Sequence, residues 1–247
     1  MGLEPPVIFV FRILPIDLQS IFFVCVLSLV PFKAMSAPLG SGERPRWVNP
    51  CGLPDHLLDP DSDLQNLPPF TAKELVSKVV EVTESAKNHA EAVEQEFRKE
   101  VFKDSAFNVD YMRQEWLPVI PPTSEDHFGG IDVKEAYKKA FEYLQYYAVG
   151  VDEMKMDQVL HPESGQFLDH FQEVENRIRE VLCELQLGMY TLKIRQNPDV
   201  MKNVMSTEYR DIPEESKRNL RDYLILRDYL KSITYIWELF RHLLKIS

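Results

Sequence analysis

The last stretch of the chain, residues 213–247, shows the clearest pattern of apolar and polar positions. Apolar side chains recur every three or four residues, and no Gly or Pro follows Pro213, so one long amphipathic helix is predicted. This stripe consists of Leu220, Tyr223, Leu224, Leu230, Ile233, Trp237, Phe240 and Leu244. A second apolar set lies outside it and consists of Ile225, Leu226, Tyr229, Ile236 and Leu243. The excess indicates either a helix covered on most of its sides or a surface that contacts another protein.

Three earlier segments repeat the same helical spacing. The first begins at Thr71 with Glu74 three positions later, a capping box in which each side chain accepts a hydrogen bond from a free backbone N–H. The second begins after Asp132, a favourable N-cap residue, and the third stops before Pro198. An all-α protein is therefore predicted. Its expected helices cover residues 71–103, 132–160, 165–196 and 213–246.

The lengths of the connections predict how these helices run. Only about four residues join the second helix to the third, which makes this pair antiparallel, whereas the other two connections are long enough to span a bundle and set their helices parallel. The predicted fold is a four-helix bundle of up-up-down-down topology with two long crossover connections, the arrangement found in growth hormones and cytokines.

Composition excludes several classes of function. The net charge is −11, with acidic residues in every segment, whereas nucleic-acid binding needs a concentrated basic face. The chain has no Glu-x-x-His pair, no glycine-rich phosphate loop within the helical region and no nucleophile elbow. We therefore expect no enzymatic activity, no catalytic residue, no metal site and no cofactor, and no nucleic-acid partner.

The N-terminal segment resembles a signal for secretion. Residues 21–30 form an apolar run of the length of a signal-peptide core, and small residues precede Ala37, so a signal peptide over residues 1–36 is predicted. An uncleaved anchor that begins near Val7 is the alternative. After cleavage we expect a secreted, extracellular protein without membrane insertion. Residues 37–70, which show no helical or strand period, are expected to form an extended N-terminal segment.

Cleavage would leave two cysteines, Cys51 and Cys183. An even number in an oxidising compartment makes them a candidate disulfide, with two unpaired thiols as the alternative. The loop that such a disulfide closes would be long, and in the chain-entropy model it would stabilise the protein by up to about 4–5 kcal/mol.

Residues 71–247 resemble the long-chain helical cytokines, in particular the group of ciliary neurotrophic factor, cardiotrophin-like cytokine and leukaemia inhibitory factor. Residues 107–110, Phe-Asn-Val-Asp, are similar to the start of the first crossover in that group, and Leu224 to Leu244, with Trp237, is similar to its final helix. A tie between Cys51 and Cys183 is also similar to the leukaemia inhibitory factor arrangement. The resemblance implies a signalling ligand with growth factor activity, whose partners are cell-surface cytokine receptor chains.

The resemblance also implies where receptors bind. One surface would comprise the end of the first helix, the first crossover and the end of the last helix; aromatic and Arg residues are frequent hot spots of interfaces. The group carries a Phe-x-x-Lys motif at the start of the last helix, but here Glu214 stands where Phe is expected, before Lys217. The resulting receptor-binding candidates are Phe97, Phe107, Trp116, Lys217, Trp237, Phe240 and Arg241.

Alternatives remain open at this point. Trp237 and Phe240 could lie in the core instead of on the surface. A secreted helical carrier that encloses an apolar small molecule, with tyrosines and methionines around the cavity, is the second hypothesis for function, and an anchored structural bundle is the third. The oligomeric state is not predicted.

Overall fold

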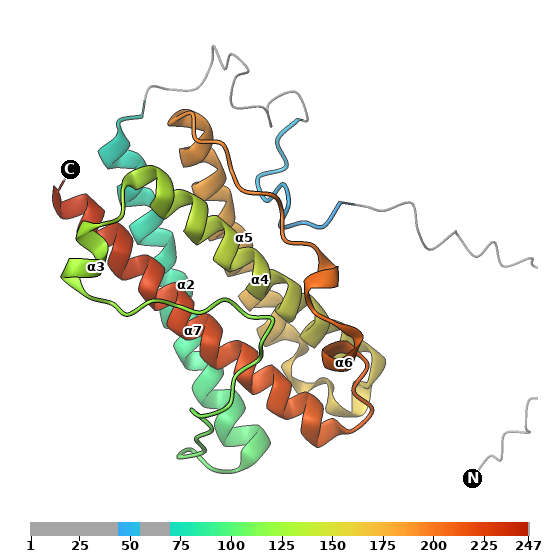
Figure 1. Ribbon diagram of the computed structural model, residues 1–247. Helices are drawn as coiled ribbons and strands as arrows, with labels where there is room; N and C mark the ends of the chain where they lie inside the picture. Colours follow the sequence, from blue (N-terminus) through green and yellow to red (C-terminus); the bar gives the residue numbers. More distant parts are fainter. Residues whose placement is uncertain (1–43, 55–69, 247) are drawn as a thin grey trace, which may run out of the picture. The chain divides into compact units, whose positions relative to one another are not determined.

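The computed structural model describes residues 44–54 and 70–246 (Figure 1). Within these residues the chain is helical and contains no strand, which confirms the all-α prediction, and four long helices form a helical bundle. The predicted signal peptide lies outside the described residues. The long helices are α2 (Ala72–Phe102), α4 (Val133–Leu160), α5 (Leu168–Thr191) and α7 (Glu215–Ile246). The short ones are α3 (Glu125–Gly129), α6 (Thr207–Arg210) and the 3₁₀ turns η2 (Pro162–Phe167) and η3 (Lys202–Val204).

Local chemistry explains where the first two long helices begin. The Thr71 hydroxyl accepts a hydrogen bond from the backbone N–H of Glu74 at 3.2 Å, and the Glu74 carboxylate accepts one from the N–H of Thr71 at 2.8 Å. The predicted capping box is therefore present. Asp132 caps α4 in the same way, because its carboxylate accepts a hydrogen bond from the N–H of Glu135 at 2.8 Å.

Helix α5 ends at Thr191, five residues before the predicted end at 196. Lys193 adopts a left-handed conformation with φ of 54°, and the N–H of Ile194 donates to the Met189 carbonyl at 2.8 Å. This is a Schellman motif, in which a left-handed residue closes the helix and the following apolar residue packs back on its last turn. The chain therefore leaves the helix while its sequence is still compatible with one.

Each long helix packs against two others. Helix α2 contacts α5 and α7, and α4 contacts α5 and α7. Aromatic pairs show which ends meet: Phe97, near the end of α2, lies 5.9 Å from Phe171, near the start of α5. Tyr137, at the start of α4, lies 5.0 Å from Phe240, near the end of α7. In both pairs the ends that meet are opposite ends of the two helices.

Helix α7 is covered on most of its sides. The apolar set that exceeds its single stripe is buried throughout, with no member more than 2% exposed: Ile225, Leu226, Tyr229, Ile236 and Leu243. Of the two interpretations of this excess, a helix covered on most of its sides is the one found. In Figure 1, α7 crosses the view diagonally beside α4, and the connection between α2 and α4 passes over it.

Two arginines of α7 hold the long connections on either side of it. The guanidinium of Arg227 donates to the carbonyls of Val109 and Met112, at 2.8 Å each, in the connection between α2 and α4. The guanidinium of Arg221 donates to the Tyr209 carbonyl at 3.0 Å, in the connection between α5 and α7. Both connections are therefore fixed to the same helix by buried, charge-assisted hydrogen bonds.

Residues 44–54, here named the N-terminal arm, are fastened to the bundle. Cys51 and Cys183 form the predicted disulfide, with an S–S distance of 2.10 Å, so the alternative of two free thiols is wrong for this structure. The indole N–H of Trp47 donates to the Val200 carbonyl at 2.8 Å. The arm thus contacts α5 through Cys183 and the connection after α5 through Val200. Among the described helices, none combines the length and apolar composition that crossing a membrane requires.

Candidate functional site

Two of the predicted receptor-binding residues lie in the core. Phe97 is 1% exposed and packs against Phe167 at 4.9 Å and against Phe171, while Phe240 is fully buried against Tyr137. Neither ring can contact a partner in this structure, and both leave the set of candidate surface residues. They became candidates because they lie near the ends of the first and last helices, where the resemblance implies a receptor surface. In each helix, however, the residue lies on the apolar stripe that faces the core.

The aromatic candidates of the first crossover are half-buried and attach it to the bundle. Phe107 stacks on Phe102 with 3.9 Å between ring centroids and meets Tyr223 of α7 edge-on at 5.3 Å. The Trp116 indole donates to the Gln114 side chain at 2.6 Å, and its ring lies where a Cβ on Gly150 would approach it to 3.1 Å. These contacts give both side chains a structural role in positioning the crossover.

Lys217 lies in the first turn of α7 and is exposed. Its amine is 3.0 Å from the carboxylate of Glu214, which is exposed as well. Exposed pairs of this kind contribute little to stability, about 0–1 kcal/mol, so the pair leaves Lys217 available to a partner.

Trp237 forms a surface cluster with two cations. The guanidinium carbon of Arg241 lies 4.4 Å from the centroid of the indole ring, and the amine of Lys87, on α2, lies 5.3 Å from it. Both distances are within the range of cation–π attraction. The ring is half-buried and Arg241 is exposed. The indole N–H is buried and has no hydrogen-bond partner among the described residues, which is costly for a polar group unless water or a partner satisfies it.

The predicted candidates do not form one surface. Lys217 and Trp237 are twenty residues apart on a continuous helix, which corresponds to about 30 Å at 1.5 Å per residue. Phe107 contacts Tyr223 in the first part of α7, whereas Arg241 lies near its end. The structure therefore separates a group around the first crossover from the Trp237 cluster, which we define as Lys87, Trp237 and Arg241.

The exposed positions of α7 after its first turn are few and mostly cationic. They are Lys231, Arg241, Lys245 and Ile246. At 100° per residue, the three cations and Trp237 fall within about 120° of the helix circumference. Glu238, which is half-buried, lies in the same sector, and the amine of Lys231 is 3.5 Å from the carboxylate of Asp228. The strip nevertheless has more cations than anions, the opposite of the whole chain with its net charge of −11, and an acidic surface would complement it.

Sequence reasoning missed a cluster of buried charges. Arg221 lies between Asp157 of α4 and Asp222, with its Nη2 2.5 Å and 2.6 Å from their carboxylate oxygens. All three side chains are buried. The pKa of Asp222 is raised to about 6, because burial and, to a smaller extent, the neighbouring carboxylate of Asp157 raise it more than Arg221 lowers it. A signal was present, because Arg-Asp-Tyr-Leu occurs twice in this otherwise apolar helix, at 221–224 and 227–230.

Tyr111 was also missed, and it is the most exposed large hydrophobic side chain of the first crossover, at 86%. It lies in the turn of residues 109–112, closed by a hydrogen bond from the N–H of Met112 to the Val109 carbonyl at 2.8 Å. The guanidinium of Arg227 donates hydrogen bonds to the carbonyls of Val109 and Met112, the first and last residues of this turn. A fixed turn that presents an exposed aromatic ring is a second place where a partner can bind at low entropic cost.

Comparison with known proteins adds no constraint: no family model, no curated protein and no solved structure matches this chain. Within the described residues, no group of three or more His, Cys, Asp or Glu side chains has the arrangement that a metal ion requires.

Proposed function

We propose that this protein is a secreted signalling ligand that binds the extracellular domains of type I cytokine receptors through the outer faces of its helices. The observation that carries the proposal is the arrangement of four long helices with two long connections, both held against α7. Bundles with two such crossovers are the type used by growth hormones and cytokines.

Up-up-down-down topology belongs to this proposal. It is supported by the opposite ends that meet in α2 with α5 and in α4 with α7. Further support comes from Gly188, in the last turns of α5, which lies directly against Tyr137 at the start of α4. Secretion is supported by the disulfide between Cys51 and Cys183, since such bonds persist in oxidising compartments.

The Trp237 cluster is the receptor-binding surface that we propose. Trp and Arg are the residue types that most often dominate binding energy. Because the exposed strip of α7 is cationic, we expect an acidic receptor surface, and binding that weakens as the salt concentration rises.

The test is a binding screen of the oxidised protein against a panel of type I receptor ectodomains by surface plasmon resonance. For a receptor that binds, Arg241→Glu should weaken affinity about thirtyfold or more, since a hot spot contributes about 2 kcal/mol or more. Lys134→Glu is the matched control, because Lys134 is an exposed cation of α4. It should bind like the wild type.

Three outcomes would count against the proposal in different ways. Silence across the whole panel would remove the receptor-ligand function. If Arg241→Glu and Lys134→Glu lost the same amount of affinity, the loss would reflect the change in net charge and not a contact at Arg241. A loss confined to Tyr111→Ala would move the binding surface to the first crossover and away from the Trp237 cluster.

A further inference from the structure

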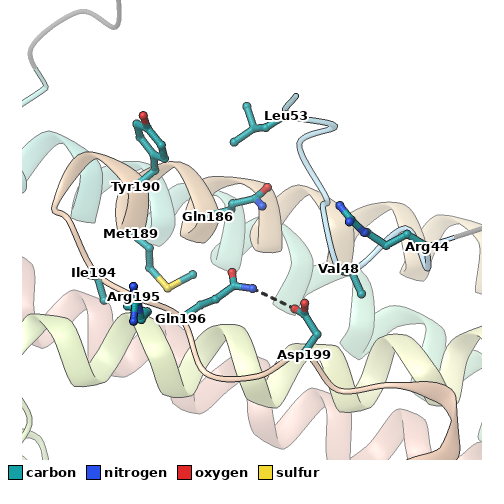
Figure 2. Close-up of a pocket in the computed structure, with 10 residues that line it drawn as sticks. All are labelled: Arg44, Val48, Leu53, Gln186, Met189, Tyr190, Ile194, Arg195, Gln196 and Asp199. Carbon is teal, nitrogen blue, oxygen red and sulfur yellow. Dashed lines mark hydrogen bonds between the residues drawn. The ribbon is translucent and has the colours of Figure 1, made fainter. Parts of the chain in front are cut away.

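A cavity of about 350 Å³ lies beside the N-terminal arm (Figure 2). Three segments enclose it, namely the arm, the last turns of α5 and the segment that follows α5. None of the residues that line it belongs to α7. Its apolar side chains are Val48, Leu53, Met189, Tyr190 and Ile194.

The walls of this cavity are fixed by covalent and hydrogen bonds. The disulfide attaches Cys51 of the arm to α5, and the N–H of Cys51 lies 3.3 Å from the side-chain oxygen of Gln186. The indole N–H of Trp47, in the arm, donates a hydrogen bond to the carbonyl of Val200, in the segment that follows α5. Because all three segments are connected in this way, the cavity is formed before any ligand arrives, as is usual for small-molecule sites.

Asp199, the acidic side chain that lines the cavity, already has hydrogen-bond partners in the surrounding protein. One oxygen of Asp199 accepts hydrogen bonds from the amides of Gln145 and Gln196, at 2.8 Å and 3.1 Å. Figure 2 shows the bond to Gln196. Burial raises the pKa of Asp199, whereas these two amides and the nearby Arg44 lower it. Asp199 thus has hydrogen-bond partners of its own, and Arg44 of the arm offsets part of its charge.

Arg195 is different. It lines the cavity and is exposed, and it makes no hydrogen bond or ion pair with any residue that the structure describes. It follows Ile194, which is buried against the end of α5. The cavity thus combines an apolar floor with one uncompensated guanidinium, the group best suited to binding a carboxylate through two parallel hydrogen bonds.

We propose that this cavity binds a small monocarboxylate with an apolar body, whose carboxylate pairs with Arg195 and whose body lies against Val48, Met189 and Ile194. At about 30 Å³ for each water-sized group, the volume suits a ligand of about a dozen non-hydrogen atoms. A medium-chain fatty acid has this size and this chemistry. The proposal is independent of receptor binding, and the site is not the enclosed space between the helices that a carrier of apolar molecules would need.

The test is isothermal titration calorimetry of the oxidised protein with decanoate at pH 7. Saturable binding of one decanoate per chain is the expected result. Decan-1-ol lacks the charge and so loses the charge-assisted hydrogen bonds to Arg195, whereas acetate lacks the apolar body and so loses the burial of the chain. Each should therefore bind at least about tenfold more weakly than decanoate. A parallel titration with 3-phenylpropanoate would show whether aromatic acids bind in place of straight-chain ones.

Variants connect the binding to this cavity. Arg195→Gln should weaken decanoate binding about tenfold, whereas Arg113→Gln, which removes an exposed arginine that does not line the cavity, should leave it unchanged. Val48→Phe should fill the space and abolish binding while the circular dichroism spectrum stays that of the wild type.

The proposal is overturned if no heat of binding is observed with decanoate. It is also overturned if decan-1-ol binds as tightly as decanoate, or if Arg195→Gln binds decanoate as well as Arg113→Gln does. Should Val48→Phe fail to fold, Arg195→Gln still decides, because an exposed side chain without a partner can be replaced without disturbing the core.

Discussion

Replacing Arg221 by Met should destabilise the protein strongly. The guanidinium is 3% exposed and lies against the carboxylates of Asp157 and Asp222, which are 7% and 1% exposed. It also donates to the Tyr209 carbonyl in the second long connection. Arg221→Met would leave two buried carboxylates without their cation, and breaking a buried ion pair in this way costs about 3–5 kcal/mol. Since single domains are stable by about 5–15 kcal/mol, a large share of the total would be lost.

Urea unfolding at pH 7, followed by circular dichroism, measures this loss. The denaturant midpoint should fall while the slope of the free energy against urea stays constant, as expected when stability alone changes. Arg177→Met is the matched control, because Arg177 also lies near two carboxylates, those of Glu173 and Glu180 at 2.9 Å and 3.3 Å, but at the surface. It should cost less than about 1 kcal/mol.

A triple variant shows whether Arg221→Met destabilises the protein by leaving two carboxylates buried without a cation or by disturbing the packing. Arg221→Met combined with Asp157→Leu and Asp222→Leu removes the whole charged cluster, and replacing such a cluster by apolar side chains is often neutral or stabilising. We expect the triple variant to be more stable than Arg221→Met alone. The reasoning is refuted if Arg221→Met costs no more than Arg177→Met, or if the triple variant is the less stable of the two.

Three further predictions concern stability. The pKa of Asp222 is raised to about 6, so the folded protein favours the protonated carboxyl. The resulting stabilisation is fully present below about pH 4, the pKa of an unfolded Asp, and is lost as the pH rises through 6. Urea unfolding should therefore show wild type losing stability relative to Asp222→Asn between these pH values. Gly188→Ala would place a Cβ 2.8 Å from Cζ of the buried Tyr137 ring, and thermal unfolding should report a loss of about 1–3 kcal/mol. Replacing Cys51 and Cys183 by Ser opens a disulfide whose cysteines are 132 residues apart, and urea unfolding should show a loss of about 5 kcal/mol.

The features that were predictable from the sequence depend on local chemistry. Apolar spacing indicates a helix without knowledge of its neighbours, and the capping interactions of Thr71 and Asp132 involve residues three positions away. The pairing of Cys51 with Cys183 followed from counting, because few cysteines remain once a signal peptide is removed. These predictions needed no tertiary information.

The features that were missed depend on contacts between distant segments. Arg221 meets Asp157 across 64 residues, and Arg227 meets Val109 across 118. An Arg-Asp pair in the middle of a helix has the same appearance in sequence whether it faces solvent or holds a connection. Similarly, the position of Phe97 near the end of α2 suggested a surface, but Phe97 lies on the inward stripe of that helix, and α5 covers its ring. No local signal predicted that Lys193 would take a left-handed conformation and end α5 early.

Stability and the proposed receptor binding depend on different parts of α7. In its first half, Arg221 and Arg227 are buried and hold the two long connections. Substitutions there should change the free energy of unfolding and the positions of these connections. In its second half, Arg241 and Lys245 are exposed, and Trp237 is partly so. A helix so fully covered can offer a partner only the narrow strip that its neighbours leave open. For that reason we propose the cationic strip as the place where a receptor binds α7, and not the apolar excess of this helix, which is buried in the bundle.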